Sequence, residues 1–154
     1  MPTVLHHAID VAATTDACWR SFADLTTWSR WFPRLTHAVV VGTEADPWRV
    51  GGRFELVFDF GPVTVPVRCE IAELVRGEKV RWIGKGFGIT GDHSHTFSTH
   101  HPGLTRVTSH EELSGAGTLL LTRSIKERVD REVHESMARL KAHIEGAGAA
   151  RLSG

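Results

Sequence analysis

Two histidines that alternate along a predicted strand are the side chains of this sequence best suited to chemistry. His93 and His95 lie two positions apart, so both point to the same side of the strand, as does Phe97. An imidazole titrates near neutral pH and can therefore act as a general acid or base. The shared side with a phenylalanine indicates that both histidines face inward.

The next predicted strand brings a carboxylate opposite these histidines. If the turn pairs Thr99 with Thr105, antiparallel counting places Glu111 opposite His93. The same count places Ser109 opposite His95 and Val107 opposite Phe97. A neighbouring carboxylate fixes the tautomer of an imidazole, and an apolar wall moves the pKa values of both groups toward neutral pH. Proton abstraction beside a carbonyl, or loss of water, would then be feasible.

The same side chains fit two further interpretations. The histidines could form only local hydrogen bonds and make the wall polar, since a fold alone does not imply a reaction. Together with Glu111 they could also offer nitrogen and oxygen ligands to a metal, although their spacing is not a recognised zinc pattern. We expect neither a metal nor another cofactor. If the site is catalytic, replacing His95 with Ala should abolish turnover and not only binding.

Alternation of apolar and polar residues predicts six strands after residue 34. They span residues 35–43, 53–60, 63–74, 79–86, 92–99 and 105–113. Short turns between them imply an antiparallel meander, and Pro66 indicates an edge or a bulge. The glycines within residues 84–88 predict a flexible loop at a pocket mouth rather than a phosphate cradle, because no helix follows.

Helices are predicted at both ends of the sequence. After a first strand over residues 3–11, Thr14 or Thr15 can cap a helix that runs to about residue 23. A second short helix with an aromatic face follows and ends at Pro33. A long C-terminal helix carries an apolar stripe made of Ile125, Val129, Val133, Met137, Leu140 and Ile144.

Several short segments, in this order, resemble the START/Bet v 1-like superfamily (SRPBCC), and within it the polyketide cyclase/dehydratase-like proteins. They are residues 13–19, Asp24 with Trp28, Trp31 and Pro33, and residues 50–54, 112–115 and 139–145. The resemblance implies an α+β helix-grip fold, a curved antiparallel β-sheet wrapped around a long C-terminal helix with two short helices after the first strand. It also implies a deep, mostly apolar cavity, but no single reaction, since the superfamily shares no catalytic motif. The sequence has no tyrosine, so no phenol can serve as an acid.

We therefore predict that the protein binds a small hydrophobic ligand, such as a lipid, a polyketide or an aromatic compound, between sheet and helix. A cyclase/dehydratase-type enzyme using His93, His95 and Glu111 is the first alternative. A co-chaperone-like or stress-related interaction module with a filled core is the second. Trp28, Trp31 and Phe32 could gate the cavity or belong to the core. The predicted ligand-binding side chains are Trp28, Trp31, Phe32, Phe54, Phe58, Trp82, Phe97, Val107, Ser109 and Ile125.

Composition limits the other partners. The 154 residues include 18 basic and 18 acidic side chains without a long run of like charge, so we expect no nucleic-acid partner. Cys18 and Cys69 are too few for a disulfide framework, and neither a signal peptide nor a membrane-inserting segment is evident, so we expect a cytoplasmic protein. One domain over residues 1–145 and a flexible tail over residues 146–154 are predicted. A homodimer through an exposed strand edge stays open.

Overall fold

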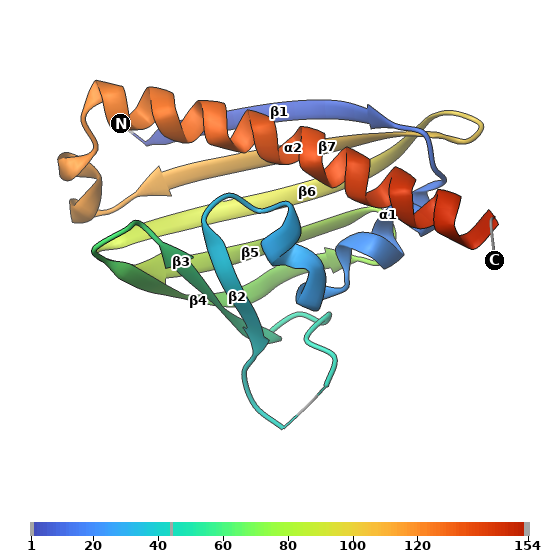
Figure 1. Ribbon diagram of the computed structural model, residues 1–154. Coiled ribbons are helices and arrows are strands. Elements are labelled where there is room, and N and C mark those ends of the chain that lie inside the picture. Colours follow the sequence, from blue (N-terminus) through green and yellow to red (C-terminus); the bar gives the residue numbers. More distant parts are fainter. Residues whose placement is uncertain (1, 44, 153–154) are drawn as a thin grey trace.

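Seven antiparallel strands form one curved sheet, and a long helix crosses it in the computed structural model, which describes residues 2–43 and 45–152 (Figure 1). The strands are β1 Thr3–Val11, β2 Leu35–Val40, β3 Arg53–Asp59, β4 Thr64–Val75, β5 Lys79–Gly86, β6 Ile89–His101 and β7 Leu104–Ser114. Strands β2 to β7 lie beside one another in chain order, and β1 pairs with β7. The predicted meander and helix-grip architecture are confirmed.

Two short helices connect β1 and β2, which form opposite edges of the sheet. Helix α1 spans Thr15–Phe22, and the hydroxyl of Thr14 caps it by accepting a hydrogen bond from the amide of Ala17 at 3.2 Å. The second helix, η1, spans Leu25–Arg30 and is a 3-10 helix. The side chain of Asp24 caps η1 by accepting a hydrogen bond from the amide of Thr26 at 3.1 Å.

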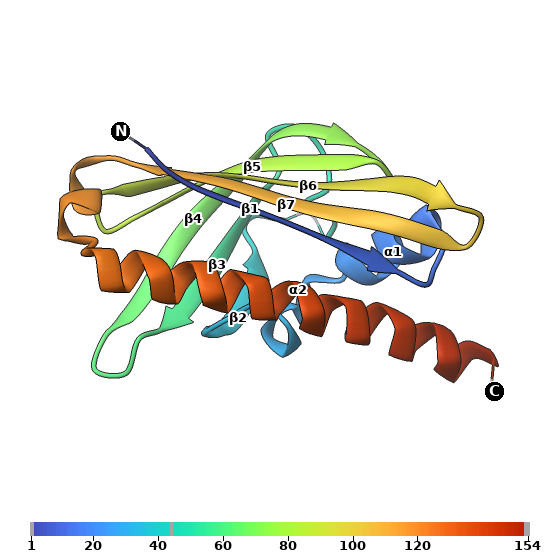
Figure 2. The same cartoon turned by 90° about the horizontal axis from the view of Figure 1, so that it is seen from above.

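The C-terminal helix α2 spans Arg123–Leu152 and lies across one face of the sheet (Figure 2). From its middle toward its C-terminus Met137, Leu140 and Ile144 are buried, whereas Ile125 near its start is 37% exposed. The sequence predicts a loose tail from Gly146, but α2 continues to Leu152, and residues 153–154 lie outside the described part. No helix in the described part of the chain is both long and apolar enough to cross a membrane.

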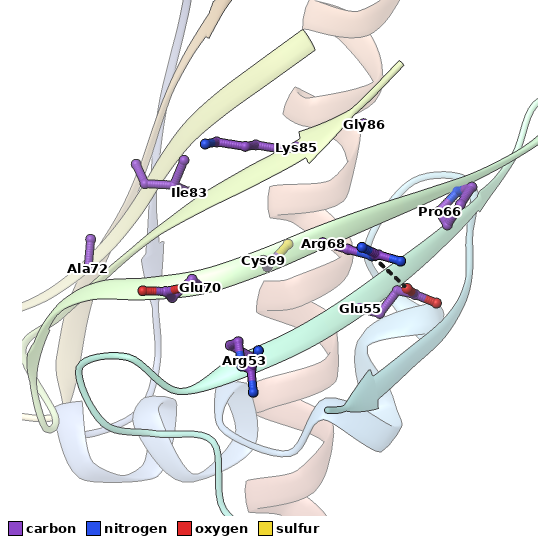
Figure 3. A pocket seen from close by; sticks show the side chains of 10 residues that line it. All are labelled: Arg53, Glu55, Pro66, Arg68, Cys69, Glu70, Ala72, Ile83, Lys85 and Gly86. Atoms are coloured by element: carbon purple, nitrogen blue, oxygen red, sulfur yellow. Dashed lines mark ion pairs between the residues drawn. The ribbon is translucent and has the colours of Figure 1, made fainter. Parts of the chain in front are cut away.

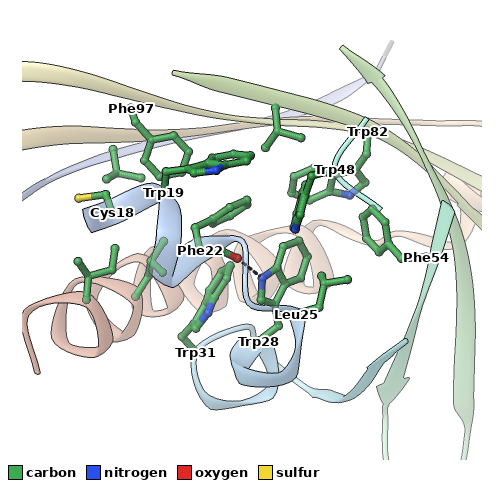
Figure 4. Packing of buried hydrophobic residues seen from close by; sticks show 14 of the residues in the cluster. Cys18, Trp19, Phe22, Leu25, Trp28, Trp31, Trp48, Phe54, Trp82 and Phe97 are labelled. Carbon is green, nitrogen blue, oxygen red and sulfur yellow. Dashed lines mark hydrogen bonds between the residues drawn. The ribbon is translucent and has the colours of Figure 1, made fainter. Parts of the chain in front are cut away.

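Aromatic side chains from the short helices, a loop and the sheet form the centre of the core (Figure 4). The indole N–H of Trp28 donates to the carbonyl of Phe22, and that of Trp48 donates to the carbonyl of Ala23, both at 2.7 Å. Trp28 and Trp31 are buried, with at most 1% of their surface exposed. These two tryptophans therefore belong to the core and do not form an exposed gate.

Three local predictions need correction. Strand β6 begins at Ile89 and includes His100 and His101, which the sequence places in a turn. Residues 84–86 belong to β5, so the predicted flexible loop reduces to the tight turn at residues 87–88. Pro66 lies in the interior strand β4, at an end that pairs with β3 alone because pairing with β5 begins at Arg68. Helix η2, Ala116–Leu120, is an addition to the predicted elements.

Candidate functional site

A cavity of about 360 Å³ lies between the sheet and the N-terminal half of α2. Strands β3 to β7 form its floor, α2 and Leu121 cover it, and residues 32–34 close one side. Its walls are mainly aliphatic and aromatic, and its ionisable lining groups are few: Arg34, Cys69, His93, Glu111 and Glu132. An apolar cavity with a few polar groups is the usual form of a small-molecule site.

Glycines in the floor make room for the carboxyl group of Glu111 and for the cavity. A Cβ atom on Gly91 would lie 3.2 Å from Oε1 of Glu111. A Cβ atom on Gly84 would lie 3.0 Å from a methyl group of Val67 and 3.4 Å from Sγ of Cys69. Both glycines line the cavity. A larger residue at either position would crowd the neighbouring side chains, which explains why the strands carry glycine there.

The predicted pairing of His93 with Glu111 is confirmed by the register of β6 and β7. Nδ1 of His93 lies 3.8 Å from Oε1 of Glu111, and Nε2 of His93 lies 3.1 Å from the hydroxyl oxygen of Ser109. The first distance is too long for a hydrogen bond and the second is within range. Ser109 thus bonds to the diagonal histidine, although it lies opposite His95 in the register.

Burial sets the protonation of this pair. It raises the pKa of Glu111 from its usual 4.5 to about 7, as the sequence predicts for an apolar wall. The same prediction is wrong for His93, because burial disfavours the charged imidazolium and lowers its pKa from 6.5 to about 3, away from neutral pH. The Glu111 side chain is 20% exposed and lines the cavity. Near pH 7 the imidazole is therefore neutral, and the carboxyl group is divided between its two forms.

His95 lies behind the cavity wall, in the core. Its ring stacks against Trp82 with a centroid distance of 5.6 Å and an interplanar angle of 5°. Its Nδ1 is buried without a hydrogen-bond partner, and burial lowers its pKa well below 6.5. His95 does not line the cavity, so direct contact with a ligand there would require movement of the wall.

The remaining sequence-predicted site residues divide between the cavity and the core. Those that line the cavity are Phe32, Phe58, Trp82 and Ile125. Those packed in the core outside it are Trp28, Trp31, Phe54, Phe97, Val107 and Ser109. Both sets come from inward-facing positions, and the alternation of a strand cannot distinguish a side chain that fills the core from one that borders a cavity.

The cavity wall contains an ion pair that the sequence analysis did not predict. The guanidinium group of Arg34 donates to both carboxylate oxygens of Glu132, with distances of 2.7 to 3.1 Å. Arg34 has a left-handed backbone with φ of 59°, and its guanidinium carbon lies 5.5 Å from the ring centroid of Phe60. Glu132 lies seven residues after Ile125, which places it on the apolar stripe of α2 and could have marked it. No sequence signal marks Arg34.

A second hollow, of about 870 Å³, lies on the opposite face of the sheet, over β3 to β5 (Figure 3). Arg53, Glu55, Arg68, Glu70 and Lys85 line it. Arg68 is 90% exposed and lies 4.0 Å from Glu55, so water surrounds these charges. Because solvated charges offer little to an apolar ligand, we place the candidate site in the smaller cavity beneath α2.

The lining side chains favour proton transfer over metal or nucleophile chemistry. Among the residues that the structure describes, no group of three or more histidine, cysteine or acidic side chains is arranged to hold a metal ion. Burial raises the pKa of the Cys69 thiol to about 12, so this cysteine stays protonated and is a poor nucleophile. Glu111, whose pKa lies near neutral pH, is the lining group best suited to transfer a proton to or from a bound molecule, and the neutral imidazole of His93 lies beside it.

Comparison with known proteins identifies the family of this chain. The family model described as polyketide cyclase/dehydrase and lipid transport matches residues 2–145. No protein of curated function matches the sequence significantly.

Solved structures share the fold at low sequence identity. The protein TTHA0849 from Thermus thermophilus is 15% identical with a TM-score of 0.76, over 94% of this chain and 99% of that one. The ZhuI aromatase/cyclase from Streptomyces sp. R1128 is 14% identical with a TM-score of 0.72, over 99% and 96%. A START superfamily protein from Mycobacterium smegmatis is 11% identical with a TM-score of 0.68, over 94% and 95%.

Proposed function

Because this chain belongs to the polyketide cyclase/dehydrase and lipid transport family, we propose that it binds a small, largely apolar molecule in the cavity beneath α2. The observation that carries the proposal is the cavity itself, about 360 Å³ with mainly apolar walls. Apolar surface of a ligand would leave water on entering it, which favours binding. A protein-interaction module with a filled core would not have this space.

A neutral apolar dye tests this proposal directly. We expect Nile red to bind saturably with increased fluorescence, and Val129→Phe to weaken binding about tenfold or more, because Val129 lines the cavity and the larger ring would occupy it. Arg131→Phe places the same ring on an exposed position of α2 and should leave binding unchanged. Equal binding by the two variants would place the dye outside the cavity and refute the proposal.

Acid–base catalysis is the second candidate, and the pair of Glu111 and His93 favours it. A carboxyl group with a pKa of about 7 beside a neutral imidazole can both give and take a proton near neutral pH. We expect the protein to speed exchange of the α-protons of 2-octanone in D2O, followed by NMR, with Glu111→Gln and His93→Gln reducing the rate. His95→Ala, at a position outside the cavity, should then affect exchange less than these two. If the α-protons of 2-octanone exchange no faster with the protein than in buffer alone, acid–base catalysis on this ketone is contradicted.

A further inference from the structure

The charges that line the cavity do not balance. Arg34 and Glu132 neutralise each other through a bidentate ion pair. His93 is neutral near pH 7, and the thiol of Cys69 is protonated. Among the described lining residues, Glu111 is therefore the ionisable group that lacks an opposite charge when it ionises.

The groups around Glu111 offer no internal cation. On β6, Nδ1 of His93 lies 3.8 Å from Oε1 of Glu111. On β4, Cys69 is close enough that the charge of Glu111 raises the pKa of its thiol, so Cys69 offers no positive charge. From β1, the register partner of Glu111 is the apolar Leu5, and His7, two residues further along the same face, pairs with Asp130 of α2 at 3.0 Å. The charged lining groups of α2 and of the segment before β2 are Glu132 and Arg34, already paired. A ligand would have to supply the missing charge.

Aromatic rings line the same cavity. Phe32 lies 5.7 Å from Phe58 and 6.0 Å from His93, measured between ring centroids, and Trp82 stacks on His93 at 4.4 Å. The face of an aromatic ring attracts a cation, most strongly when both are removed from water. A carboxylate among aromatic rings is thus a chemically suitable surrounding for an ammonium group attached to an apolar body.

Resting on the proposed function, we infer that the ligand is a hydrophobic amine whose ammonium group pairs with the Glu111 carboxylate, while its apolar body fills the cavity beneath α2. A hydrophobic carboxylic acid fits less well, because it would have to displace Glu132 from Arg34 and would face Glu111. A neutral alcohol would gain the apolar contacts without the charge-assisted hydrogen bond.

Pairing of an ammonium group with Glu111 fixes the sign of the pH dependence of binding. The free carboxyl group has a pKa of about 7, whereas pairing with an ammonium group requires its ionised form. An alkylamine stays protonated up to about pH 10. Binding of the amine must therefore release a proton below pH 7, and its affinity should rise about tenfold between pH 6 and pH 8. A ligand that accepts a hydrogen bond from the protonated carboxyl group would show the opposite slope.

The experiment compares octylamine, 1-octanol and octanoate as displacers of Nile red from the whole protein at pH 6 and pH 8. At pH 8 we expect octylamine to bind about tenfold more tightly than 1-octanol, and octanoate to bind most weakly. Glu111→Gln should remove the preference for the amine and its pH dependence, with 1-octanol binding retained. Glu112→Gln, on the same strand with its side chain 49% exposed, is the matched control and should behave as the wild type.

Other results would contradict the amine assignment, and they show whether the proposed function fails with it. Displacement by 1-octanol without an amine preference, or an amine preference that survives in Glu111→Gln, overturns the amine assignment and leaves the proposed function standing. Tighter binding of octanoate, or affinity for the amine that falls with rising pH, overturns it as well. If neither Nile red nor the octyl compounds bind, the proposed function fails together with the inference.

Discussion

Glu111 destabilises the fold when it ionises in the cavity, and this should be visible in the free energy of unfolding. Its pKa is about 7 in the folded chain and near 4.5 when unfolded, so the folded state holds the proton more tightly. The stability that this group contributes is present below pH 4.5 and is lost as the pH rises through 7. We predict that Glu111→Gln is more stable than the wild type at pH 8 by up to about 3 kcal/mol.

Urea denaturation at pH 8 and pH 4.5 measures this difference. At pH 4.5 the two proteins should unfold at similar urea concentrations, because the carboxyl group is then protonated in the folded wild type. Glu112→Gln should show no comparable gain at pH 8, since its side chain is half exposed. A gain for Glu111→Gln that is the same at both pH values would show that charge burial is not its cause.

His95 should make the fold sensitive to acid. Its pKa is held well below 6.5 by burial, so the unfolded chain takes up a proton there that the folded chain does not. Stability from this group is therefore present above pH 6.5 and falls as the pH drops below it. Replacing His95 with Phe should reduce the loss of stability below pH 6.5 by up to about 1.4 kcal/mol per pH unit.

Thermal unfolding of His95→Phe between pH 7 and pH 5 checks this. Phe97→Leu changes a neighbouring core ring without removing a titratable group, and it should keep the pH slope of the wild type. An unchanged slope in His95→Phe would mean that this imidazole is protonated in the folded chain.

At the residue scale, what can be predicted depends on local pattern. The pairing of His93 with Glu111 follows from one short turn and the alternation of two strands, and it is confirmed. The pairing of Arg34 with Glu132 joins residues far apart in sequence and depends on how α2 lies on the sheet. Helical spacing places Trp31 on the correct face, but its burial in the core depends on packing that the sequence does not display.

At the element scale, the end of α2 gives a sharp test. Gly146 and Gly148 lie within the helix, and a Cβ atom on either would meet nothing within 4 Å. Alanine favours a helix over glycine by about 1 kcal/mol at such positions. Gly146→Ala and Gly148→Ala should therefore each stabilise the protein by roughly 0.5 to 1 kcal/mol in urea denaturation. No change in either variant would instead support the flexible tail that the sequence predicts over residues 146–154.

A second pair of glycines carries two conflicting signals in the sequence. The alternation over residues 79–86 predicts a strand, which β5 confirms, whereas the glycines within residues 84–88 predict a loop, although Gly84 and Gly86 both belong to β5. The reason lies on β4, where Val67 is close enough to restrict a side chain at either position. Such a restraint comes from a neighbouring strand, so glycine signals a loop and a crowded strand equally well from sequence alone.

At the scale of the whole molecule, the two halves of α2 are held differently. The C-terminal half buries Leu140 and Ile144 in the core, and Lys141 donates a hydrogen bond to the carbonyl of Asp10 on β1 at 2.8 Å. The N-terminal half covers the cavity, so its apolar side chains have fewer partners. Fewer buried contacts lower the free energy of local opening.

Hydrogen exchange should therefore distinguish the two halves and report ligand binding. We expect the amides of residues 126–133 to exchange roughly tenfold faster or more than those of residues 138–145 in the free protein. Saturating 1-octanol should slow exchange in the first segment and leave the second nearly unchanged, because only the first borders the cavity. Val129→Phe fills that space with protein and should slow exchange in residues 126–133 without octanol. Equal exchange rates along α2 in the free protein would mean that the helix opens as one unit. Protection by 1-octanol that is spread evenly over α2 would mean that the ligand does not act through the cavity.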